Sequence, residues 1–149
     1  MRGKKIGIGL CILGMLFGCT KHEPKLIVKL FYLDSCGGCQ ELHQNLIVKI
    51  EEQFHDEILI ERYDMDQEEN KAVYDETVTQ IDIDNLKMLD GHQVPFLAVE
   101  GYFATVGYSS HLDEHYLNAL KAILAHEDFE PHLPPGAGTW LYKEAYRGI

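Results

Sequence analysis

The first half of the chain switches between two hydrophobic periods. Residues 25–32 form an almost continuous run of aliphatic, β-branched and aromatic side chains, which predicts a buried strand. Residues 57–64 predict a second strand. Between them, residues 40–54 contain no Pro or Gly and place apolar side chains at helical spacing. One face of this helix collects the residues expected to pack on the core: Cys39, Leu42, His43, Leu46, Ile50 and Phe54.

The segment after the second strand predicts a crossover helix. Residues 67–80 contain helix formers and spaced apolar side chains at Ala72, Val73 and Val78, a pattern typical of a helix that faces solvent. A further short helix is expected over residues 85–89, ended by the Asp-Gly dipeptide that follows.

The next segment predicts a hairpin and a closing helix. Residues 94–99 and 102–106 read as strands joined by a Glu-Gly turn, and residues 112–124 form an amphipathic helix. The resulting order, β-α-β-α-β-β-α, predicts an α/β fold. We expect a central mixed four-stranded sheet covered by helices on both faces.

The amino end has the layout of an export signal. An apolar run over residues 6–17 follows three cations, at Arg2, Lys4 and Lys5. The run is shorter than the ~18 residues expected of a membrane-spanning helix. Residues 16–19, Leu-Phe-Gly-Cys, resemble the bacterial lipobox, which implies cleavage after residue 18 and lipid attachment to Cys19. An ordinary secretory signal and an uncleaved anchor are the alternatives.

The charge of the chain limits its partners. Removal of residues 1–18 would leave 131 of the 149 residues, enough for one domain. Three cations would leave with the signal, so the formal net charge would fall from −11 to −14. Nucleic acid and anionic headgroups attract positive charge, so neither is an expected partner. Contact with the membrane should come from the acyl chains on Cys19.

The four cysteines of the chain have different expected fates. Cys11 leaves with the signal and Cys19 carries the lipid, so Cys36 and Cys39 are the thiols of the folded domain. A disulfide between residues this close constrains little of the unfolded chain, which disfavours a structural staple. A zinc site needs about four ligands, and no second Cys-x-x-Cys is present. Redox chemistry is therefore favoured.

The two cysteines should differ in reactivity. Cys36 lies where the helix begins, and the unpaired N–H groups and positive dipole end of a helix stabilise an anion there. Such a position lowers a thiol pKa from ~8.5 toward ~3.5–7.5. Cys39 lies on the core face and should be sheltered. Cys36 is thus the expected nucleophile and Cys39 the resolving thiol.

The motifs together resemble the thioredoxin family over residues 25–125. They are, in order, a strand ending Phe31-Tyr32, the Cys-x-x-Cys at the next helix start, the segment 63–67, and Val94-Pro95 opening a hairpin that ends Val106-Gly107. The resemblance implies a thioredoxin-like fold and a redox-active Cys36–Cys39 disulfide. It also implies a cis bond before Pro95, with Pro95 opposite the cysteines and the Val94 backbone pairing with the client chain. A trans proline starting an edge strand is the alternative.

The chain departs from the family pattern at several positions. Ser35 replaces the tryptophan before the first cysteine, and Gly37-Gly38 replaces Gly-Pro. The buried acid that takes a proton from the second cysteine would fall at Leu30 and is missing. His43, one turn beyond Cys39, is the candidate proton acceptor. The alternative is a hydrogen-bonded core histidine without catalytic function.

These features predict an extracytoplasmic, lipid-anchored thiol-disulfide oxidoreductase that needs no metal or organic cofactor. Its partners would be protein clients with thiols or disulfides and an upstream membrane electron donor or acceptor. The two glycines between the cysteines offer no cation, and Asp34 and Glu41 disfavour a thiolate, so reduction of clients is the favoured direction. In a cell with two membranes, Thr20 after the lipidated cysteine favours the periplasmic face of the outer membrane.

Two other classes of protein are compatible with the sequence. A metal-delivery protein could bind copper through the two cysteines together with His43, His92 or His111. Alternatively, the domain could be an accessory module in which partner contacts matter more than turnover.

The sequence divides into four segments. Residues 1–18 are the expected signal, 19–24 a lipid-anchored linker, 25–127 the thioredoxin-like domain and 128–149 a C-terminal extension. Within the extension, Pro and Gly indicate a linker, and residues 139–147 predict one or two helical turns capped by Thr139, which pack back on the domain.

Overall fold

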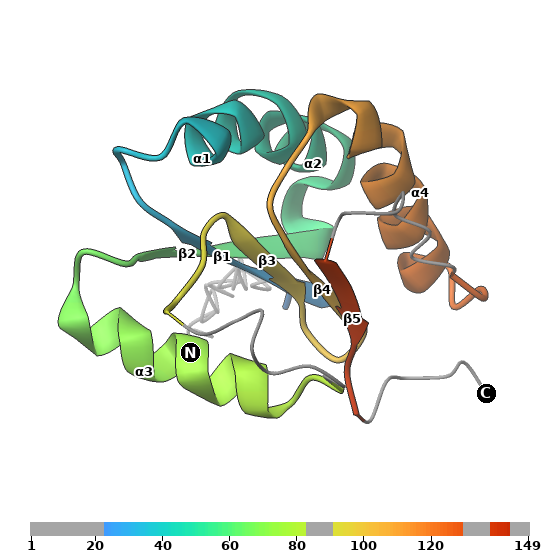
Figure 1. The fold of residues 1–149 in the computed structure, drawn as a ribbon. Helices are drawn as coiled ribbons and strands as arrows, with labels where there is room; N and C mark the ends of the chain where they lie inside the picture. Colours follow the sequence, from blue (N-terminus) through green and yellow to red (C-terminus); the bar gives the residue numbers. More distant parts are fainter. Residues whose placement is uncertain (1–22, 83–90, 130–137, 144–149) are drawn as a thin grey trace, which may run out of the picture.

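A computed structural model of the chain describes residues 23–82, 91–129 and 138–143. Within them, helices lie on both sides of a central sheet (Figure 1). The predicted α/β class is confirmed, but the sheet has five strands where four were expected. The strands are β1 (Leu26–Tyr32), β2 (Ile58–Asp64), β3 (Phe96–Val99), β4 (Phe103–Val106) and β5 (Gly138–Leu141).

The helices lie close to their predicted positions. They are α1 (Gly37–Leu42), α2 (Val48–Phe54), α3 (Glu68–Thr79) and α4 (Asp113–Leu124). A π-helical turn, His43–Ile47, joins α1 to α2, so one continuous helix runs from residue 37 to residue 54. The proposed signal, Cys19 and the short helix predicted over 85–89 lie outside the described residues. Among the described helices, none is long and apolar enough to cross a membrane.

The order and direction of the strands bring three loops to the same end of the sheet. The order is β2-β1-β3-β4-β5, with β1 parallel to β2 and antiparallel to β3. Phe31 of β1 is paired with Tyr63 on one side and with Phe96 on the other. The loops that follow β1 and β2 and the loop that precedes β3 therefore lie at the same end of the strands. Parallel strands end together, and an antiparallel neighbour begins there.

Alternating side chains of the strands build two apolar cores. On one face, Val28 and Leu30 pack with α1, α2 and α4, and the predicted core face of the first helix is buried there apart from His43. On the other face, Phe31 and Phe96 pack with Tyr74 of α3. The crossover helix was expected to face solvent, with Ala72, Val73 and Val78 as its spaced apolar residues. Its buried residues are Tyr74 and Thr77, whereas Val73 and Val78 are partly buried against this core and Ala72 is exposed.

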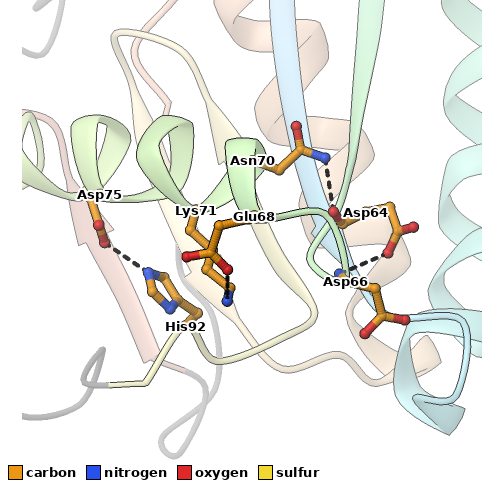
Figure 2. A network of polar contacts seen from close by, with 7 residues as sticks. All are labelled: Asp64, Asp66, Glu68, Asn70, Lys71, Asp75 and His92. Atoms are coloured by element: carbon orange, nitrogen blue, oxygen red, sulfur yellow. Dashed lines mark hydrogen bonds and ion pairs between the residues drawn. The ribbon is translucent and has the colours of Figure 1, made fainter.

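The turn between β2 and α3 is held by side-chain hydrogen bonds. Asp64 Oδ1 accepts a hydrogen bond from the backbone N–H of Asp66 at 3.0 Å, and Asn70 Nδ2 donates to the Asp64 carbonyl at 2.8 Å (Figure 2). An aspartate that accepts from the backbone two residues ahead stabilises a turn. These bonds fix where α3 begins relative to the end of β2.

The C-terminal extension contributes a strand, and the helical turns predicted from Thr139 are wrong for residues 139–141. Residues Gly138–Leu141 pair antiparallel with β4, from Val106↔Gly138 to Phe103↔Leu141. The unpaired backbone groups along β4 would otherwise form an open edge, and β-branched and aromatic side chains such as Thr139 and Trp140 suit a strand. The Leu141 carbonyl also accepts the N–H of Asp82 at 2.8 Å. The segment is thus part of the same sheet as β1–β4.

Candidate active site

The cysteine pair occupies the junction between β1 and α1. The N–H of Cys36 donates to the Leu33 carbonyl at 3.1 Å, which closes the turn that leaves the strand. Cys36 is the N-cap of α1. It is joined to Cys39 by a disulfide whose Cα atoms are 5.2 Å apart, within the range of protein disulfides.

The two sulfur atoms have different surroundings. Cys39 is 1% exposed and packs on the core side of the helix, whereas Cys36 is partly exposed. The Sγ of Cys36 accepts a hydrogen bond from the backbone N–H of Cys39 at 3.1 Å. A hydrogen bond donated to an ionisable group favours its charged form, so this N–H favours a thiolate on Cys36 once the disulfide is reduced.

Pro95 lies against the turn between the cysteines. The Val94–Pro95 peptide bond is cis, and Pro95 is buried. A Cβ placed on Gly38 would lie 3.6 Å from Pro95 Cδ, an ordinary van der Waals contact. A Cβ on Gly37 would meet no atom within 4 Å. One glycine of the turn therefore packs on the proline, and the other faces open space beside the partly exposed Cys36.

The loop around Pro95 is fixed from both sides. The Pro95 carbonyl accepts the N–H of Gly107 at 2.9 Å, which ties it to the end of β4. On the other side, the hydroxyl of Tyr74 donates to the Gln93 carbonyl at 3.1 Å. Val94, whose backbone was expected to pair with a client, lies between these two anchors and is partly exposed.

His43 lies in the π-helical turn and is only partly buried. Burial, followed by the charge of Arg62, lowers the pKa of the imidazole below 6.5, although Glu51 and Asp34 act in the opposite direction. Its ring meets the ring of Tyr32 edge-on, with centroids 5.1 Å apart. A π turn contains more residues per turn than an α-helix, so the spacing that placed His43 fully on the core face does not hold there.

The described residues contain one buried acid, Asp113, which sequence reasoning missed. Its carboxylate accepts hydrogen bonds from Lys49 Nζ and from the hydroxyl of Tyr108, both at 2.6 Å. Lys49 lies ten residues beyond Cys39, about 15 Å along a helix. Asp113 therefore links α2 to α4. It does not replace the missing buried acid of the family, whose position is taken by Leu30, a fully buried residue of β1.

The histidines proposed as copper ligands do not form a metal site with the two cysteines among the described residues. His92 Nε2 donates to Asp75 Oδ1 at 2.9 Å. His111 is exposed in the turn before α4, and His115 lies four residues further along and is also exposed. Over residues 23–82, 91–129 and 138–143, no three His, Cys, Asp or Glu side chains are grouped so that they could hold a metal ion.

Comparison with known proteins finds no match to this chain among protein-family models, curated proteins or solved structures. The functional interpretation therefore depends on the residues and on their geometry.

Proposed function

We propose that this chain is a thioredoxin-like thiol-disulfide oxidoreductase in which Cys36 is the nucleophile and Cys39 the resolving thiol. The observation that carries the proposal is the asymmetry of the pair: Cys36 is partly exposed and accepts a backbone N–H, whereas Cys39 is 1% exposed. The order of elements from β1 to α4 and the packing of Pro95 on Gly38 support the family resemblance.

In the reductive direction, the Cys36 thiolate attacks one sulfur of a client disulfide. A Cys36–client disulfide forms, the client S–S bond breaks, and the second client sulfur leaves as a thiolate that takes a proton from water. Cys39 then loses its proton and attacks Cys36 Sγ. The Cys36–client bond breaks, the Cys36–Cys39 disulfide is restored, and the released client sulfur leaves as a thiolate that takes a proton from water. The client is thus released as a dithiol, and two electrons have passed from the protein to the client.

The resolving step needs a proton acceptor, because a thiol in apolar surroundings resists ionisation. His43 lies one helical turn after Cys39, and its lowered pKa keeps the imidazole neutral near pH 7. A neutral imidazole can accept a proton, so we assign this role to His43. The alternative, a hydrogen-bonded core histidine without catalytic function, has less support because His43 is only partly buried.

The proposal includes attachment to a membrane through Cys19 on its extracytoplasmic face. Clients would be proteins with disulfides near that surface, and a membrane electron donor would reduce the Cys36–Cys39 disulfide after each turnover. Oxidation of clients would use the same two thiols in reverse. Client reduction remains the favoured direction because Asp34 and Glu41 disfavour a thiolate.

Trapping of the mixed disulfide tests the proposal. The full-length protein in detergent would be reduced, freed of reductant and mixed with insulin, whose disulfides serve as the probe. Cys39→Ser should accumulate a covalent complex through Cys36, because the resolving thiol is gone. Cys36→Ser should form none. If the parent protein fails to reduce insulin and Cys39→Ser traps no complex, the proposed function is wrong.

A further inference from the structure

The loop that precedes Pro95 has an unusual backbone. Gly91 has φ = 90° and His92 has φ = 55°, so two consecutive residues lie in the left-handed region. For a non-glycine residue this conformation is uncommon and persists only where the surroundings hold it. The support for His92 should therefore be visible in its contacts.

Two consecutive residues of α3 hold two consecutive residues of this loop. The His92 ring donates from Nε2 to Asp75 Oδ1 at 2.9 Å, and Figure 2 shows the two side chains facing each other between α3 and the loop. The Tyr74 ring lies edge-on to the His92 ring, with centroids 5.0 Å apart. The Tyr74 hydroxyl donates to the Gln93 carbonyl at 3.1 Å. The residue that follows is Val94.

Tyr74 can act as a rigid support because it is fixed by the core. It is 1% exposed, and its ring contacts Phe31 edge-on at 5.1 Å and Phe96 at 4.9 Å between centroids. Phe31 lies near the end of β1, five residues before Cys36, and Phe96 follows Pro95 directly. The aromatic cluster thus joins the strand that leads to the cysteines, the loop around Pro95 and α3.

We propose that Tyr74 and Asp75 are positioning residues that hold the backbone of Gln93 and Val94 in place for an extended polypeptide client. This inference rests on the proposed function. Neither residue has a described contact with Cys36 or Cys39, so sulfur chemistry with a small disulfide does not depend on them. A polypeptide client that pairs with the Val94 backbone does depend on them.

The test compares two substrates with one set of full-length variants. Tyr74→Phe removes the hydroxyl and keeps the ring, whereas Asp75→Ala removes the acceptor for His92. Each should raise KM for insulin reduction about fivefold, the factor expected for loss of one net hydrogen bond. The kcat and the rate of exchange with a small aromatic disulfide should stay at the parent value.

Two controls separate positioning from general loss of structure. Asp75→Asn keeps an oxygen that can accept from His92 and should restore KM close to the parent value. Glu76→Ala changes the exposed neighbour on α3, whose side chain makes none of these contacts, and should leave KM unchanged.

The inference is overturned if KM for insulin stays constant in both variants, or if reaction with the small disulfide falls in parallel with insulin reduction. Failure of the proposed function would look different, because the parent protein itself would then react with neither substrate.

Discussion

Among single residues, the proposed chemistry depends on the environments of the two sulfur atoms. The hydrogen bond from the Cys39 N–H to Cys36 Sγ is local, since it joins residues of one helical turn. Its existence could be predicted from the Cys-x-x-Cys spacing at a helix start. The burial of Cys39 could likewise be predicted from the spacing of apolar residues along residues 40–54.

Other residues of the site could not be predicted in this way. The pairing of Asp113 with Lys49 spans 64 positions, and that of His92 with Asp75 spans 17. Neither pair follows a local pattern, because tertiary packing alone brings the partners together. The partial exposure of His43 could not be predicted either, since it depends on a π-helical turn that no residue in the sequence indicates.

Replacement of His43 tests the proton acceptor. His43→Ala should slow release of the mixed disulfide by about a hundredfold at pH 7.5, the lower end of general-base contributions. In the parent, release should slow as pH falls through the pKa of His43, below 6.5, because a protonated imidazole accepts no proton. Single-turnover quenching across pH measures both effects.

The variant should lack the inflection due to His43, and Gln44→Ala, at an exposed neighbouring position, should behave like the parent. Equal release rates for His43→Ala and the parent at every pH would remove His43 from the mechanism.

For helices and strands, the hydrophobic periodicity of the sequence predicted most positions correctly, and the predictions that were wrong have physical causes. The π turn changes the spacing of residues along the first helix. In this turn, the side-chain amide of Asn45 donates to the carbonyl of Glu41, which lies in α1, at 2.9 Å. Residues 138–141 form a strand because β4 offers them a partner edge. That edge is a property of the assembled sheet, so composition near Thr139 could not reveal it.

Two buried tyrosines, Tyr142 in the C-terminal extension and Tyr116 in α4, offer a matched pair of variants. The Tyr142 hydroxyl is buried and has no hydrogen-bond partner among the described residues, whereas the Tyr116 hydroxyl lies 2.9 Å from Thr105 Oγ1. Tyr142→Phe should raise the free energy of unfolding by about 1 kcal/mol, because an unsatisfied polar group leaves the interior. Tyr116→Phe should lower it by about 1 kcal/mol.

Urea unfolding, followed by circular dichroism, measures both changes. A loss of stability in Tyr142→Phe equal to that in Tyr116→Phe would mean that the Tyr142 hydroxyl is hydrogen-bonded after all.

At the scale of the whole molecule, the sequence predicted a mixed sheet between helices, and the structure adds β5 at its edge. The order of strands places the cysteine turn, the Pro95 loop and the end of β4 together. This grouping could be expected only through the family resemblance, because hydrophobic period alone does not fix which strands are neighbours. The predicted signal and lipid anchor depend on the sequence of residues 1–19.

Lipid attachment can be tested directly. Cys19→Ser should move the protein from the membrane fraction to the medium or the periplasm, because the sulfur that carries the acyl chains is gone. Labelling with a radioactive fatty acid should mark the parent protein and not the variant. Cys11→Ser, which changes a residue of the expected signal, should leave both results unchanged. If the Cys19→Ser protein stays in the membrane fraction, the predicted anchor is wrong.

The pH dependence of alkylation at each cysteine of the reduced, folded protein measures whether the two thiols differ as proposed. Peptide mapping by mass spectrometry can follow Cys36 and Cys39 separately. We expect Cys36 to react quickly, with an apparent pKa below the ~8.5 of a free thiol, and Cys39 to stay protected until the protein unfolds. Equal, slow reaction of both thiols with an ordinary pKa would contradict it.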